Sequence, residues 1–170
     1  MTNAELDAVP GDAMVQGDYR YCLTRKWAVG LPSVIFIGLN PSTADATQND
    51  PTIRKCMRYA MSWGFGNLTM LNLFAFRATD PTVMRAAKDP IGPLNDYWVN
   101  VFMSDLQDTL AVACWGEYGF ERGREFADRY VGQLAALRVN FSGQPAHPLY
   151  LPSDLKPVPY LARPGELQHA

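Results

Sequence analysis

The chain has 170 residues, of which 48% are apolar, so it is long enough for one domain with a core of its own. Its formal charge of −2 argues against a protein that is held to nucleic acid by charge alone. No apolar run approaches the roughly 20 residues of a membrane-spanning helix, and the polar, acidic N-terminus lacks a signal-peptide pattern, so we expect a cytoplasmic protein with no membrane partner.

The first 18 residues contain four of the 17 acidic residues, no Lys or Arg and no hydrophobic periodicity. We therefore expect a mobile acidic tail at 1–18, a single α/β domain at 19–160 and a C-terminal tail at 161–170. Without the first segment, 15 basic and 13 acidic residues remain, so the body carries a net charge of about +2.

Buried strands alternate with helices along the rest of the chain. The run VIFIGL has no polar alternation, as expected of a parallel strand covered on both faces. The pattern predicts an edge strand at 19–29 and buried strands at 34–39, 68–74, 110–114 and 137–141. It predicts helices at 51–63, from Asp80-Pro81 onward, at 93–107 and at 120–137. For the first of these helices, Asp50 suits the N-cap, Pro51 the first position and Gly64 the C-terminal stop. The expected fold is a three-layer α/β sandwich with a mainly parallel four-stranded central sheet and an N-terminal edge strand.

Sheets of this kind bind ligands outside the carboxyl ends of their strands. The segment GLNPSTAD leaves the first buried strand, and its glycine lets a ligand approach the backbone closely. Its short polar side chains indicate a binding site, although Asx and Ser/Thr capping of a turn is the alternative. The candidates here are Gly38, Leu39, Asn40, Pro41, Ser42, Thr43 and Asp45.

The segment MLNLFAFRATDP ends the next buried strand. Asn72 interrupts an apolar run, and its carboxamide can both donate to and accept from the edge of a nucleobase. Its alternative role is to tie the sheet to a loop. Phe74 is a candidate for stacking on a ring or for the core, and Arg77 for a phosphate or a solvated surface.

The segments WGEYG and GQPAHPLYLP follow the last two strands. Gly116 permits close approach, and His147 lies in a proline-rich loop where it can donate a hydrogen bond to a developing anion. A structural histidine is the alternative, and Tyr150 either stacks on a ligand or packs. A nucleophilic Cys114–His147 pair is conceivable, but a thiol inside a strand is usually inert.

The three cysteines have no C-x-x-C spacing, so we expect buried thiols in a reducing compartment and neither a metal site nor a cofactor. The sequence also lacks G-x-G-x-x-G, Walker-A, H-E-x-x-H and G-x-S-x-G patterns. The sequence therefore contains none of these motifs for dinucleotide or nucleoside triphosphate binding, metalloprotease activity or serine-hydrolase activity.

Four segments together, GLNPSTAD, NLFAFRATDP, DPIGPLND and HPLYLP, resemble a family of uncharacterised bacterial and phage proteins that share a domain of unknown function, over about 19–159. More distantly, the order of the motifs resembles the uracil-DNA glycosylase superfamily. GLNPS is similar to its GINPG-type first motif, and HPLYLP to its HPSP-type final motif. Ser42 and Leu149 depart from those motifs, so a modified base or a free nucleotide fits as well as uracil.

That second resemblance implies a role for each candidate. Asn40 or Asp45 would position the attacking water, Asn72 would read the base, Phe74 would stack on it, and His147 would stabilise the leaving anion. Such enzymes flip the nucleotide out of the duplex. The iron–sulfur members need four cysteines, and with three we expect no cluster.

Three functions are compatible with these residues. The first is hydrolysis of a nucleobase N-glycosidic bond in DNA or a nucleotide. The second is a non-catalytic module that binds a nucleobase or nucleic acid on the same fold, and the third is an enzyme of different chemistry in the same cleft. A metal requirement would favour the third.

Overall fold

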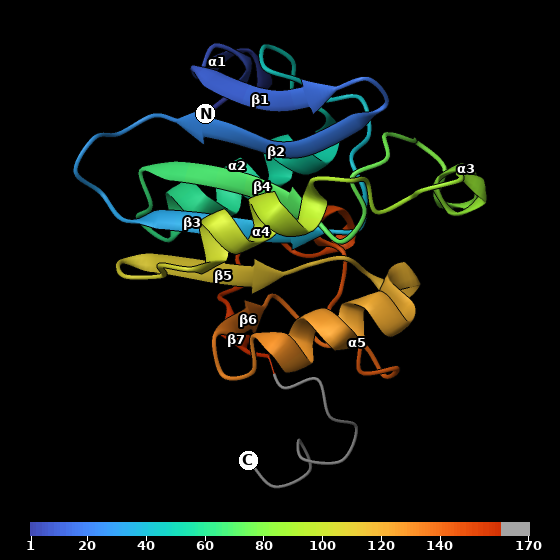
Figure 1. Ribbon diagram of the computed structural model, residues 1–170. Coiled ribbons are helices and arrows are strands. Elements are labelled where there is room, and N and C mark those ends of the chain that lie inside the picture. Colours follow the sequence, from blue (N-terminus) through green and yellow to red (C-terminus); the bar gives the residue numbers. More distant parts are fainter. Residues whose placement is uncertain (161–170) are drawn as a thin grey trace, which may run out of the picture.

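The computed structural model describes residues 1–160 and shows a mixed α/β domain built on one seven-stranded sheet (Figure 1). Along the sheet the strand order is β1-β2-β4-β3-β5-β6-β7. The strands are β1 (Gly11–Gln16), β2 (Tyr19–Lys26), β3 (Ser33–Gly38), β4 (Asn67–Asn72), β5 (Thr109–Ala113), β6 (Leu134–Ala136) and β7 (Val158–Pro159).

The four central strands β4, β3, β5 and β6 are parallel, as predicted, and the outer pairs are antiparallel. Strand β3 lies between β4 and β5, so the chain leaves β3 toward one neighbour and later returns to its other side. Open α/β sheets bind ligands where the order reverses in this way. The fold therefore points to the carboxyl ends of β3 and β5.

Helices cover both faces of the sheet. Helices α1 (Asn3–Asp7) and α2 (Pro51–Ser62) pack on one face, and α4 (Asn95–Met103) and α5 (Phe120–Arg129) on the other, which is the face toward the viewer in Figure 1. The short helix α3 (Pro81–Ala86) lies beside the carboxyl edge. Among residues 1–160, no helix is long and apolar enough to cross a membrane.

Local sequence explains how α2 begins and ends. Asp50 is its N-cap and accepts from the Ile53 N–H at 2.8 Å, and Pro51 fills the first position. Gly64 follows with φ of +88°, a conformation that favours glycine. These three predictions are confirmed. The cap also fixes the position of the Asp50 carboxylate at the start of α2.

The expectation of a tail at 1–18 is wrong. Leu6 of α1 is fully buried against the α2 face, and β1 pairs with β2 along its length. Strand β2 is therefore an interior strand, where an edge strand was predicted. The side chains of β1 are mostly exposed, so its hydrogen bonds to β2, and not its apolar pattern, place it in the sheet.

The boundaries of α5, β6 and α4 also differ from the prediction. Helix α5 ends at Arg129, and Gly132 with φ of +76° turns the chain into β6 at 134–136, whereas a helix to 137 and a strand at 137–141 were expected. Helix α4 is shorter than the predicted 93–107. All three cysteines are buried, as expected. The C-terminal tail predicted at 161–170 lies outside the described residues.

Candidate active site

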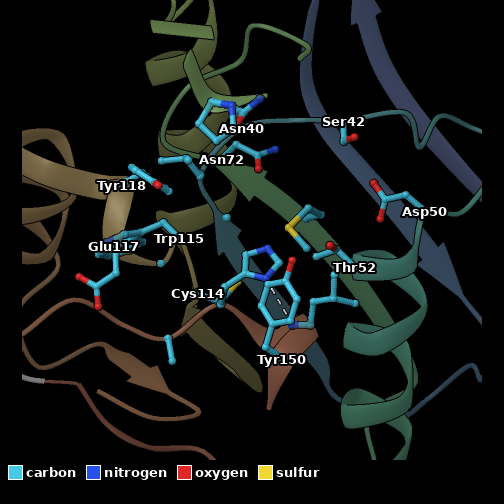
Figure 2. Close-up of a pocket in the computed structure, with 18 of the residues that line it drawn as sticks. Asn40, Ser42, Asp50, Thr52, Asn72, Cys114, Trp115, Glu117, Tyr118 and Tyr150 are labelled. Carbon is cyan, nitrogen blue, oxygen red and sulfur yellow. Dashed lines mark hydrogen bonds between the residues drawn. The ribbon is translucent and has the colours of Figure 1, made fainter. Parts of the chain in front are cut away.

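A cavity of about 540 Å³ opens at the carboxyl edge of the sheet. The ends of β3, β4 and β5, the start of α2 and the loop around 138–151 form its walls. Figure 2 shows Asn40 and Asn72 together on one side, Asp50 and Thr52 at the start of α2, and Tyr150 in front. The cavity therefore occupies the place that the strand order indicates.

Most of the residues predicted from sequence meet in this cavity. Those that line it are Gly38, Leu39, Asn40, Ser42, Asn72, Gly116, His147 and Tyr150. Thr43 and Arg77 line a second hollow next to it. Neither hollow is lined by Pro41, Asp45 or Phe74.

The three exceptions have structural roles. The Asp45 carboxylate accepts from the backbone N–H groups of Thr47 and Gln48 at 2.9 and 2.8 Å, and these bonds hold its pKa below its ordinary value. Phe74 packs against the core on the α4 side of the sheet. Pro41 is buried, and its carbonyl accepts from the Ala78 N–H. The predicted water-positioning role of Asp45 and the stacking role of Phe74 therefore do not fit the structure.

Asn72 is the last residue of β4 and is only 2% exposed. The residue lines the cavity, and its Nδ2 is buried and has no hydrogen-bond partner within residues 1–160. Gly38 on the neighbouring strand makes room for it, because a methyl group there would lie 2.8 Å from Asn72 Oδ1. Buried amides are nearly always paired, so this one is available to a ligand.

His147 faces the cavity from the last loop with one ring nitrogen already engaged. Its Nδ1 accepts from the Leu149 N–H at 3.3 Å. Burial lowers the pKa of His147, with a smaller opposing effect of the Asp50 charge. The ring is therefore neutral at pH 7, and because Nδ1 accepts, the proton lies on Nε2. This leaves Nε2–H as a donor.

Asn40 is held by its own loop. Its Nδ2 donates to the carbonyl oxygens of Ala78 at 2.8 Å and Pro41 at 3.1 Å. These bonds fix the amide so that Oδ1 is its remaining acceptor toward the cavity. Such an oxygen can orient a water molecule.

Sequence reasoning did not select the charged residues of the cavity wall, which are Arg20, Asp50, Glu117 and Arg138. Asp50 was recognised only as a helix cap, and Arg20 only as part of a strand. Arg20 is 2% exposed, donates to the Ala44 carbonyl, and has an Nε with no described partner. Burial lowers its pKa to about 10, and the Asp50 charge partly offsets this effect. The sequence signal for Arg20 is a cation within the otherwise apolar run YRYCL.

The wall opposite α2 is built around Trp115, which is buried and donates from Nε1 to Gln144 Oε1 at 2.7 Å. Gly119 and Gly123 pack so closely on its indole that a methyl group at either would clash. Tyr118 lines the cavity beside it, and Cys114 lies on the floor. This wall is rigid and aromatic, which suits a flat ring.

The cavity thus combines a neutral imidazole donor, the three carboxamides of Asn40, Asn72 and Asn140, one buried carboxylate and aromatic rings. This set suits recognition of a planar polar ring and stabilisation of an anion leaving it. Residues 1–160 contain no group of three or more His, Cys, Asp or Glu that could hold a metal ion.

The family model described as "Protein of unknown function (DUF1643)" matches residues 20–149. No curated protein and no solved structure matches the chain. The match spans all the motifs that line the cavity except the end of the last loop. The chain therefore belongs to the DUF1643 family, as the resemblance of its motifs to a domain of unknown function predicted.

Proposed function

We propose that this protein hydrolyses the N-glycosidic bond of a nucleobase, in DNA or in a nucleotide, on a fold like that of the uracil-DNA glycosylases. The order of its motifs along adjacent strand ends supports this proposal, because the first, second and last motifs meet in one cavity. The observation that carries it is the buried, unpaired amide of Asn72.

A buried amide without a partner costs about 1–3 kcal/mol, unless a ligand or water supplies the hydrogen bond. A nucleobase presents neighbouring donors and acceptors on one edge, which a carboxamide matches. The roughly 540 Å³ cavity has room for a base and its sugar. Asn72 would therefore select the base by its edge.

His147 would act on the leaving group. When the bond between the base nitrogen and the anomeric carbon breaks, the electron pair stays with the base and makes it an anion. The neutral imidazole donates from Nε2 to that anion, since its Nδ1 is held by Leu149. Donors of this kind contribute on the order of 100-fold to 1000-fold in rate.

A water molecule would supply the other half of the reaction. Asn40 Oδ1 orients the water, and the Asp50 carboxylate takes the place expected for Asp45, because it is the buried carboxylate of the cavity. The water oxygen bonds to the anomeric carbon, its proton passes to Asp50, and the base anion is finally protonated by solvent. No metal or cofactor takes part in this scheme.

Aromatic rings would hold the base flat. Tyr118 and Tyr150 line the cavity, whereas Phe74 is partly buried and packs against the core. Tyr150 is 84% exposed, and its ring centroid lies 5.9 Å from that of His147. If the substrate is a polymer, its nucleotide must be flipped out of the stack to reach this cavity.

The test is a base-release screen on single-stranded and duplex oligonucleotides that each contain one uracil, mismatched or modified base, together with free nucleosides and nucleotides. We expect release of one base, a loss of about 100-fold or more in His147→Ala, and altered base preference in Asn72→Asp. Arg129→Ala, at the end of α5 away from the cavity, is the matched control. Full activity in both His147→Ala and Asn72→Asp would refute the proposal.

A non-catalytic nucleobase-binding module is the second candidate. It is favoured by the engagement of the Asp45 carboxylate and of Asn40 Nδ2 within the chain, which leaves fewer groups for water activation. Base binding that needs Asn72, survives in His147→Ala and gives no product would establish this function instead.

A further inference from the structure

A second hollow, of about 430 Å³, opens beside the cavity. The two hollows share Ser42, Ala78 and Thr79, so a single ligand can extend from one into the other. The second hollow is lined in addition by Thr43, Arg77, Asp80 and Val83. None of the steps proposed above uses it.

Arg77 brings a positive charge to this hollow. Its side chain is half-buried, and its guanidinium makes no hydrogen bond or ion pair with any of residues 1–160. Burial is the first cause of the lowered pKa of Arg20, and the Arg77 charge adds to it. The Arg77 charge also helps to lower the pKa of the Asp45 carboxyl, but the Asp45 Oδ1 accepts from Thr47 and Gln48 and not from Arg77. The donors of Arg77 therefore remain available to a further anion.

The remaining polar side chains of the hollow are three hydroxyls, which can donate, and one carboxylate. The hydroxyls of Ser42, Thr43 and Thr79 have no side-chain hydrogen bond within the described part of the chain. The nearby carboxylate of Asp80 is used to cap α3, where its Oδ1 accepts from the N–H and the hydroxyl of Thr82, both at 2.8 Å. A guanidinium with hydroxyls around it is the side-chain set that proteins use for phosphate.

We propose that the second hollow binds a phosphate group of the same substrate whose base enters the larger cavity, with Arg77 as its principal contact. This inference rests on the proposed function for the position of the base, but the phosphate site itself does not. The phosphate is either the monoester of a free nucleotide or a diester of a nucleic-acid chain. Both present oxygens that a guanidinium can bind bidentately.

The test measures binding of inorganic phosphate, of four nucleosides, of their 5′-monophosphates and of a short single-stranded oligonucleotide by isothermal titration calorimetry. We expect a monophosphate or the oligonucleotide to bind about tenfold to 100-fold more tightly than the matching nucleoside. Arg77→Ala should abolish that difference without changing nucleoside affinity, and Arg77→Lys should retain part of it. Arg129→Ala removes the same charge at the far end of α5 and should behave as the native protein.

Two results would overturn the phosphate site. One is equal affinity of the native protein for nucleosides, monophosphates and oligonucleotide. The other is an Arg77→Ala protein, folded by circular dichroism, that retains native affinity for every phosphate compound. Tighter Arg77-dependent binding of the monophosphate supports a free nucleotide, and of the oligonucleotide a nucleic-acid chain. Arg77-dependent phosphate binding without base release would refute the glycosylase function and leave the phosphate site standing.

Discussion

Gly38→Ala provides a direct test of Asn72, because the two residues lie opposite each other on β3 and β4. A methyl group at Gly38 would lie 2.8 Å from Asn72 Oδ1 and 3.5 Å from Met70 Sδ. Ordinary contact begins at 3.4 Å, so the Asn72 amide must move by about 0.6 Å. Gly38 does not have a positive φ, so the backbone accepts alanine and the amide contact is the main perturbation.

The effect on stability should be small. Overpacking lowers the free energy of unfolding by about 1–3 kcal/mol. Replacing a glycine inside a strand by alanine raises it by about 0.5–1 kcal/mol. The net loss is at most about 2.5 kcal/mol, which lowers the melting temperature by about 10 °C or less in a protein of this size. Circular dichroism melts check this expectation.

The effect on binding should be larger. A shift of about 0.5 Å is enough to spoil a positioned hydrogen bond, so we expect base affinity or base release to fall by about tenfold to 100-fold. In an Asn72→Ala background, Gly38→Ala should have no further effect, since the contact that it disturbs is gone. Native binding by Gly38→Ala, or an undiminished effect in the Asn72→Ala background, would refute the role assigned to Asn72.

Three further predictions concern other parts of the molecule. Burial lowers the pKa of His147, so the unfolded chain takes up a proton at higher pH than the folded one. The resulting stability is present above about pH 6.5 and is lost as pH falls below it. The free energy of unfolding should therefore drop more between pH 7.5 and 5.5 in the native protein than in His147→Gln, and equal drops would contradict the assignment. Removing residues 1–17 exposes the site of Leu6 and the edge of β2, and should lower the melting temperature by about 5 °C or more; an unchanged melt would mean that this segment contributes nothing. Burial raises the pKa of Cys22 and of Cys56, so iodoacetamide should modify no cysteine in the folded protein and all three after unfolding, as mass spectrometry will show.

The parallel core was predictable because its strands are apolar on both faces. A continuous apolar run can be recognised without knowing how the strand aligns with its neighbours. Strand β1 was not, because its exposed side chains carry no alternation and backbone hydrogen bonds alone place it against β2. The end of α5 was misplaced for a related reason. The run LAALRV is as apolar as a buried helix, and only the positive φ of Gly132 decides where the helix stops.

In the candidate site, too, the sequence pattern identified some residues, whereas the position of others depends on how a loop folds. Asn72 and His147 were identified because each is a polar residue at the end of an apolar segment, and strand ends meet at one edge. Asp45 and Asp50 could not be ranked in this way, since both lie in the loop after β3 and both can cap a turn. The loop turns at Asp45, and this turn places Asp50 in the cavity wall. Arg25 holds the loop in this conformation, because its guanidinium donates to the carbonyl oxygens of Asp45 and Gln48.

Arg25 and Arg20 explain why a polar loop can be held at this edge. Both come from β2, both are buried, and each donates to carbonyls of the segment 44–48. Carbonyls turned away from regular structure need donors, and two buried guanidiniums supply them. Arg20 Nε has no hydrogen-bond partner within the described residues, and the charge of Asp50 in the same cavity wall partly offsets the effect of burial on the Arg20 pKa. The strand that was expected at the edge of the sheet thus orders the loop of the first motif and sets the charge of the site.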